Sequence, residues 1–191
     1  MASYTVPGIG EAEADKVRGI LQERLVALSD LHLTLKHIHW NVVGENFIAV
    51  HEMIDPQVDD VRLFVDAIAE RIATLGGEPL GTPGAIVNGR SWDDYSLNRA
   101  VTTEHLAALN VVYEGVVADQ RKAINALEDL DLVSQDMLIG QADKLEMFHW
   151  FVRAHLEDKG GHLATEGART EKAAAKQVRG RTAKRAAKKA R

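Results

Sequence analysis

Apolar residues recur at intervals of three and four over four long stretches of this chain, and that pattern restricts the fold more than any other feature. Such spacing places apolar side chains along one face of an α-helix. It predicts helices over about Glu13–Val42, Phe47–Leu75, Leu97–Leu127 and Val133–Lys159. Four amphipathic helices of this length must bury their apolar faces against one another, so the pattern favours a helical bundle.

The connections between these helices differ in length. Gly44 and Asn46 mark a tight turn after the first helix, and the third and fourth helices are also joined by a short turn. A Gly- and Pro-rich segment, Glu78–Tyr95, separates the second helix from the third, and Ser91–Asp94 is expected to cap a short helix there. Two hairpins joined by one long crossover predict an all-α, ferritin-like four-helix bundle. Pro56, inside the second helix, predicts a kink, or a restart with Asp55 as the cap.

Composition excludes several classes of protein. With 46% hydrophobic and 27% charged residues the chain can bury a core. No apolar run approaches the ~20 residues of a membrane span, and the start of the chain lacks the features of a signal peptide. Cysteine is absent, which excludes disulfides and thiolate metal sites and fits a reducing cytoplasm. We expect a helical cytoplasmic protein.

Charge is distributed unevenly along the chain. Residues 169–191 carry ten Lys and Arg and one acid, a net +9, so the overall −5 leaves −14 on the rest. The sequence predicts an N-terminal segment (1–15), a bundle (16–167) and a disordered basic tail (168–191) that binds DNA phosphates without reading base sequence. The candidate DNA-binding residues are Arg169, Lys172, Lys176, Arg179, Arg181, Lys184, Arg185, Lys188, Lys189 and Arg191.

Five residues on the first two helices stand out as candidate metal ligands and catalytic groups: His39, His51, Asp55, Asp66 and Glu70. His51 and Asp55 are four residues apart, as are Asp66 and Glu70, so each pair projects from one helical face. The hairpin about Gly44 brings His39 opposite His51. Two imidazoles and a carboxylate suit a divalent transition metal with open positions, non-haem iron above all. The alternative is a set of ordinary solvated polar residues.

The two pairs cannot meet within one chain. Their centres are fifteen residues apart, or ~22 Å along a helix, whereas metal–ligand bonds are only ~2 Å. A two-fold axis crossing the second helix near Asp60 and Val61 would lay two such helices antiparallel. His51 and Asp55 of one chain would then face Asp66 and Glu70 of another, with the site between subunits.

Two dense motifs carry a resemblance to a known family. One comprises residues 39–44 (HWNVVG) and 47–55 (FIAVHEMID), and the other comprises residues 65–71 (VDAIAER) and 75–79 (LGGEP). Over about Val6–Leu156 the chain resembles the Dps family, the ferritin-like DNA-binding proteins of starved bacterial cells. The basic tail is similar to that of the actinobacterial type.

The resemblance implies a hollow homo-dodecamer with ferroxidase sites at two-fold interfaces. His39, His51 and Asp55 would come from one chain, and Asp66 and Glu70 from its neighbour. It also implies that Fe²⁺ is oxidised, preferably with hydrogen peroxide rather than dioxygen, and that ferric mineral is stored inside. Trp40 would lie beside the metal, as an electron donor or as a packing residue. Consuming Fe²⁺ and peroxide together would protect DNA at the nucleoid.

Alternatives remain open on the sequence alone. A nucleoid-packaging protein without significant iron oxidation would share the basic tail, and a chaperone-like or signalling bundle would stay monomeric or form a small oligomer. The acidic residues Glu128, Asp129, Asp131 and Asp136 would either line a three-fold pore for Fe²⁺ or simply favour a helix start. Glu146 and His149 are expected to be surface or interface groups.

Overall fold

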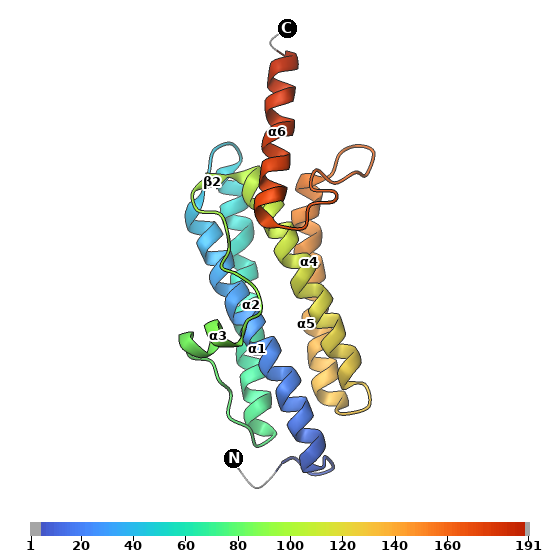
Figure 1. Cartoon of the computed structure of the whole chain (residues 1–191). Helices are drawn as coiled ribbons and strands as arrows, with labels where there is room; N and C mark the ends of the chain where they lie inside the picture. Colours follow the sequence, from blue (N-terminus) through green and yellow to red (C-terminus); the bar gives the residue numbers. More distant parts are fainter. Residues whose placement is uncertain (1–4, 190–191) are drawn as a thin grey trace.

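The computed structural model describes residues 5–189, and these form six helices and two short strands (Figure 1). In chain order the elements are α1 (Glu11–Asn41), β1 (Val42–Val43), α2 (Phe47–Thr74), α3 (Pro83–Gly89), β2 (Ala100–Val101), α4 (Thr102–Leu127), α5 (Leu132–Leu156) and α6 (Glu171–Lys189). None of the described helices is long and apolar enough to cross a membrane.

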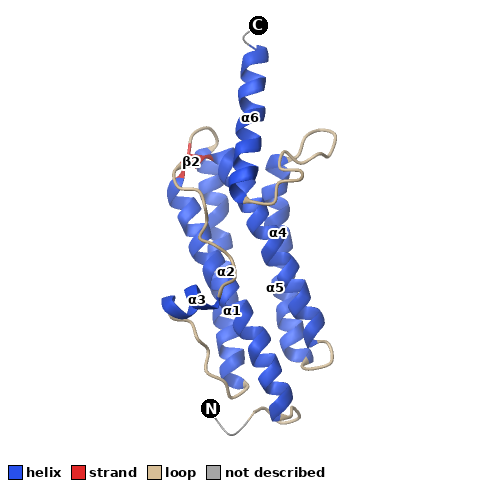
Figure 2. Cartoon of the chain, viewed as in Figure 1, coloured by secondary structure: helices blue, strands red, loops and turns tan. Residues whose placement is uncertain are grey.

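Two antiparallel helical hairpins, α1–α2 and α4–α5, pack side by side and enclose the core (Figure 2). The apolar stripes predicted from the sequence meet there: Leu21, Leu28 and Leu35 of α1, and Ile54, Val61 and Ile68 of α2, are fully buried. The long crossover between α2 and α4 carries α3 and passes over α1. The prediction of an all-α bundle with one long crossover is confirmed.

The turn between α1 and α2 follows the sequence prediction closely. Gly44 and Asn46 both have positive φ, 92° and 60°, which glycine and asparagine adopt more readily than other residues. Immediately before the turn, β1 pairs in parallel with β2, with Val42 opposite Ala100. This pairing holds the C-terminal end of the crossover beside the C-terminal end of α1.

Several predicted boundaries are wrong. The first helix begins at Glu11, inside the segment expected to precede the bundle, and α4 begins at Thr102 rather than near Leu97. The short crossover helix is Pro83–Gly89, capped by Thr82, instead of following Ser91. Pro56 lies inside one continuous α2, so no new helix starts after Asp55. Proline at this point removes one backbone donor, and the packing of α2 on α1 maintains the helix.

The predicted disordered tail is also wrong for residues 171–189, which form α6 and pack on α4. Ala174, Ala175 and Val178 are buried, and Arg179 makes a bidentate ion pair with Glu104 at 2.8 and 2.6 Å. Alanine is too small to build a core alone, but it lets two helices approach closely. The Arg179–Glu104 pair then fixes the register of α6 on α4. The outer part of α6 extends beyond the rest of the protein (Figure 1).

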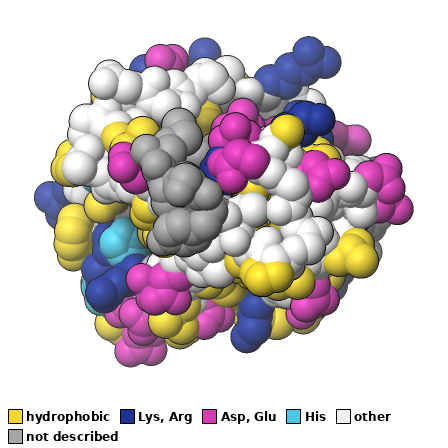
Figure 3. Space-filling view, turned by 90° about the horizontal axis from the view of Figure 1, so that it is seen from below, with side chains coloured by type: hydrophobic (Ala, Val, Ile, Leu, Met, Phe, Trp, Pro, Cys, Tyr) yellow, Lys and Arg dark blue, Asp and Glu magenta, His cyan; other side chains and the backbone are white. Residues whose placement is uncertain are grey.

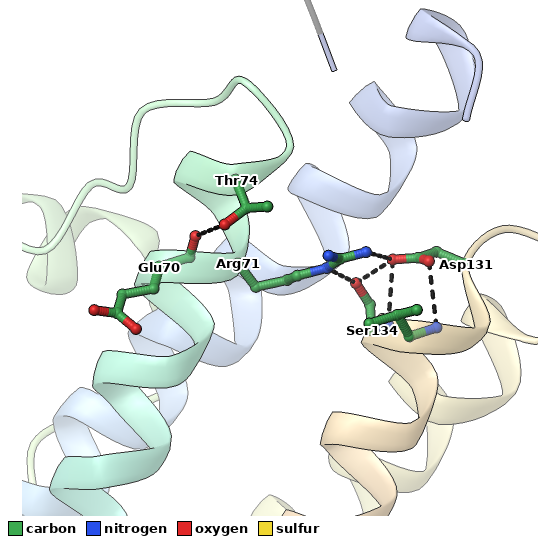
Figure 4. A network of polar contacts seen from close by, with 6 residues as sticks. Glu70, Arg71, Thr74, Asp131 and Ser134 are labelled. Carbon is green, nitrogen blue, oxygen red and sulfur yellow. Dashed lines mark hydrogen bonds and ion pairs between the residues drawn. The ribbon is translucent and has the colours of Figure 1, made fainter. Parts of the chain in front are cut away.

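The turn between α4 and α5 is stabilised by one of its acidic residues. Asp131 is buried, accepts hydrogen bonds from the backbone N–H groups of Val133 and Ser134, and pairs with Arg71 of α2 at 2.6 Å (Figure 4). Burial opposes its ionisation, but hydrogen bonds from Arg71 and Ser134 outweigh that and lower the pKa of Asp131. The helix-start interpretation therefore holds for Asp131.

The other three acids of this turn, Glu128, Asp129 and Asp136, are exposed. The turn lies at the opposite end of the bundle from the tip of α6 (Figure 1). Seen from that end, acidic side chains are spread over the surface among apolar ones (Figure 3).

His149 is buried within the bundle, although a surface or interface group was predicted. Its Nε2 lies 3.0 Å from Oδ1 of Asn110, and its ring stacks on Tyr113. Burial is the main reason that the pKa of His149 falls from 6.5 to about 4, with the nearby charge of Arg153 adding to it. A neutral His149 donates one hydrogen bond to Asn110, and protonation would place a charge among apolar neighbours.

This pKa predicts acid sensitivity. The pKa of His149 is lower in the folded protein than in the unfolded chain, so neutral His149 contributes to the free energy of unfolding. This contribution, about 3 kcal/mol, is complete above pH ~6.5 and is lost as the pH falls through about 4. His149→Gln, which retains a donor for Asn110 but cannot titrate, should flatten the decline of stability over this range. Urea denaturation of the wild type and of His149→Gln at a series of pH values measures this decline. If the stability of the two proteins falls in parallel, His149 is not the titrating group.

Candidate metal centre

His39 and His51 meet beside the turn that joins α1 to α2, as the sequence predicts. Their rings stack with centroids 3.6 Å apart and planes inclined by 23°. His39 is buried in the last turn of α1, and His51 is partly buried in the second turn of α2. Phe47 covers the other side of the His51 ring, with centroids 5.0 Å apart. The tight turn at Gly44 is what brings the two helix ends together.

Backbone hydrogen bonds orient both imidazoles. Nδ1 of His39 lies 3.1 Å from the carbonyl oxygen of His51, and Nδ1 of His51 lies 3.0 Å from that of His39. A carbonyl oxygen can only accept, so Nδ1 carries the proton in each ring and Nε2 keeps a lone pair. The last turn of α1 leaves carbonyls without helical donors, which makes that of His39 available. Both rings are thereby held in the tautomer that binds metal through Nε2.

Asp55 completes this cluster. Its Oδ1 is 3.1 Å from Nδ1 of His39 and 2.9 Å from Nζ of Lys36. The hydrogen bond from Lys36 is the main cause of the lowered pKa of Asp55, and the nearby His39 adds to it. Sequence reasoning did not include Lys36, although it precedes His39 by three residues and shares its helix face. The contact with Lys36 therefore favours the ionised form of Asp55.

Asp66 and Glu70 lie on the same helix but far from this cluster, as predicted. Both are exposed, and Glu70 points away from the neighbouring Arg71–Asp131 contact (Figure 4). The continuous α2 separates the centres of the two pairs by fifteen residues, or ~22 Å. Within residues 5–189 of one chain, three or more His, Asp or Glu side chains nowhere form a group that could hold a metal ion.

The surface between the two pairs mixes charged and apolar residues. Asp59 and Arg62 of α2 are exposed there beside the largely exposed Leu33 of α1 and Leu63 of α2, and a cavity of about 760 Å³ extends along them to Asp66. Trp40, next to His39, is 70% exposed, and the Lys36 ammonium lies 5.9 Å from its ring centre. Trp40 therefore does not pack inside this chain. Leu33, Trp40 and Leu63 are thus large apolar side chains that remain exposed in the single chain.

The candidate DNA-binding residues lie on α6 and on the segment before it. Lys176 and Arg181 are exposed on α6, whereas Arg179 is paired with Glu104. Lys184, Arg185, Lys188 and Lys189 belong to α6, but their side chains lie outside the described part of the structure, as does Arg191 altogether.

Comparisons with known proteins agree with this fold and its pattern of residues. The ferritin-like domain family matches residues 19–159. The DNA protection during starvation protein of Mycolicibacterium smegmatis is 60% identical over 183 residues, which make up 96% of this chain and 100% of that protein. The chain belongs to the Dps family of ferritin-like proteins.

Solved structures of the Dps family show the same fold. A structure of Mycobacterium smegmatis Dps is 62% identical and covers 87% of this chain and 95% of its own, with a TM-score of 0.86. DpsA14 from Streptomyces coelicolor is 60% identical and covers 84% of this chain and 96% of its own, with a TM-score of 0.83. The resemblance to the Dps family inferred from the two motifs is confirmed.

Proposed function

We propose that this Dps-family protein is a ferroxidase and iron-storage protein that oxidises Fe²⁺ at sites shared by two subunits. The observation that carries the proposal is the stacked pair His39 and His51 with Asp55 beside it. Two imidazoles with accessible Nε2 atoms and one ionised carboxylate form a donor set suited to ferrous iron as substrate. His39, His51 and Asp55 would bind the iron from one chain.

Asp66 and Glu70 would supply oxygen ligands from the neighbouring chain. A two-fold axis near the middle of α2 brings the His51 end of one helix against the Glu70 end of the other. The exposed leucines Leu33 and Leu63 lie on the face that such an arrangement would bury. Hard carboxylate oxygens also stabilise the ferric product better than the ferrous substrate, which favours oxidation.

We further propose that the shell is a hollow homo-dodecamer in which ferric mineral accumulates, with hydrogen peroxide preferred to dioxygen. Each Fe²⁺ loses one electron, and peroxide accepts two as its O–O bond breaks and its oxygens reach the oxidation level of water. Removing Fe²⁺ and peroxide together prevents hydroxyl radical from forming near DNA. Trp40, exposed beside His39, would supply an electron to radicals that escape.

DNA binding through α6 is the second part of the proposal. The relatives' name, DNA protection during starvation protein, accords with it. Exposed cations on a projecting helix provide contacts to phosphates without reading bases. A protein with both activities would act in the cytoplasm, at the nucleoid.

The choice of oxidant distinguishes this proposal from its alternatives. Fe²⁺ should disappear many times faster with stoichiometric peroxide than in air, as followed by stopped-flow absorbance of the ferric product. Spin trapping should detect little hydroxyl radical. Glu52→Ala, which removes an exposed carboxylate beside His51 but outside the proposed site, is the matched control and should retain the wild-type rate.

Two results would count against it. Equal rates with peroxide and air would favour the chemistry of ordinary ferritins. No acceleration by either oxidant would leave a nucleoid-packaging protein as the better account.

A further inference from the structure

A large cavity away from the iron site lies between α1, the crossover and α4. Its volume is about 1090 Å³, and its walls come from residues 24–34, 91–96, 111–119 and 169–172. The last of these ranges leads into the first turn of α6. Cavities of this size hold small organic molecules or ions in many proteins. None of the proposed iron ligands lines it.

Arg24 lines this cavity and makes no close ion pair within the described residues. It is only 6% exposed, and its Nε is buried without a hydrogen-bond partner. Among residues 5–189 it forms no ion pair within 4 Å. Burial lowers the pKa of Arg24 from its ordinary value, and the charges of Asp119 and Glu23 oppose this, yet a guanidinium remains charged at any physiological pH. A largely buried guanidinium without a close ion pair is unfavourable, and a bound anion would stabilise it.

Of the five carboxylates in the wall, Asp93 is exposed to solvent and the other four are engaged with other donors. Asp30 and Asp94 both pair with Arg90, Asp119 pairs with Lys122, and Glu171 accepts a hydrogen bond from the backbone N–H of Ser96 at 2.6 Å. Asp30 also accepts from the indole N–H of Trp92. These carboxylates are therefore held in position by other donors.

Further donors converge on the same space. The hydroxyl oxygen of Ser96 is buried and, within the described residues, has no hydrogen-bond partner. Arg169 and Lys172 add two cations to the wall, and the first turn of α6 opens beside them. A guanidinium fork, a hydroxyl and a helix N-terminus together match a tetrahedral oxyanion, which offers several acceptors around one centre.

We propose that this cavity binds a small phosphate-class oxyanion, with Arg24 and Ser96 as its principal contacts. The ligand is either inorganic phosphate or the phosphate group of a small metabolite, because both present the same oxygens. The cavity exceeds the volume of phosphate itself, so an organic group can be accommodated beside it. Because residues 169–172 contribute to the wall, a bound anion would also stabilise the attachment of α6.

Isothermal titration calorimetry on the assembled full-length protein, with iron removed by chelation, tests this. Inorganic phosphate and glycerol 3-phosphate are titrated separately, at constant ionic strength set with chloride. Saturable binding is expected. Arg24→Met should weaken it by about tenfold or more, since charge-assisted hydrogen bonds are lost, and Ser96→Ala by a smaller factor. Arg99→Met, which removes an exposed arginine outside the cavity, should leave it unchanged.

The affinities of the two probes identify the source of the anion: tighter binding of the ester indicates a metabolite, and tighter binding of phosphate indicates the inorganic ion. Without phosphate, Arg24→Met should assemble normally and unfold at the same or a higher temperature, because it removes a largely buried charge that has no close ion pair. Failure of that variant to assemble would overturn the proposal in favour of a carboxylate from a neighbouring subunit. Identical phosphate binding by the wild type and Arg24→Met, or none by the wild type, would also overturn it. These readouts need no iron, so they are independent of the ferroxidase proposal.

Discussion

Mixed shells of two inactive variants should regain about a quarter of the wild-type rate of Fe²⁺ oxidation. One variant is Asp66→Ala/Glu70→Ala, which retains the His39–His51–Asp55 cluster. The other is His51→Ala/Asp55→Ala, which retains both distal carboxylates. At each two-fold interface, random pairing joins unlike chains half the time, and one of the two sites there is then intact, so about one site in four is complete.

Each variant alone should assemble but lose rapid oxidation, since half of every site is missing. The four changed side chains are exposed or partly buried, so they should not unfold the bundle. The two proteins are unfolded and refolded together, mixing is verified by mass spectrometry of the intact shell, and stopped-flow traces are compared with those of separately refolded samples. Verified mixed shells with no recovered activity would show that the site does not draw on two chains.

Much of this site could be predicted because its residues are close in sequence and the intervening structure is regular. His39 and His51 flank a turn that Gly44 and Asn46 specify, so the hairpin forces them together. His51 and Asp55 share a helix face by spacing alone. The distance between this cluster and Glu70 follows from helical rise, and α2 is indeed continuous over that length. Local geometry of this kind needs no knowledge of tertiary packing.

The sequence predictions fail where contacts between distant parts of the chain determine the position of a residue. Glu104 lies 75 residues before Arg179, so no local pattern shows that the two pair and fasten α6 to the bundle. The buried face of α6 consists mainly of alanines, which a search for large apolar residues overlooks. His149 becomes buried because Asn110, on another helix, provides its partner. Lys36 was overlooked because a lysine on a helix is ordinarily solvated, and only the fold places it against Asp55.

Removal of residues 181–191 should abolish the retardation of DNA in gels while leaving the shell and its iron chemistry intact. This segment contains six Lys and Arg and no acid, so the remaining chain has a net charge of −11 instead of −5. Cutting after Gly180 preserves the buried residues Ala174 and Val178 and the Arg179–Glu104 pair. Cutting after Gly167 should also abolish binding, but it would expose the face of α4 that α6 covers and so lower stability as well.

The salt dependence of full-length binding provides a quantitative check. Neutralising Z phosphates gives a slope of about −0.9Z in log K against log[salt], so the six cations of residues 181–191 in one chain give at most about −5. If several α6 helices of one shell contact the same DNA, the slope becomes steeper and the avidity rises. Because phosphate contacts ignore base sequence, shuffling residues 181–191 should leave binding nearly unchanged, whereas replacing their Lys and Arg by Gln should eliminate it. If shells lacking residues 181–191 still retard DNA at physiological salt, the contact must come from the body of the subunit, and the assignment of DNA binding to α6 fails.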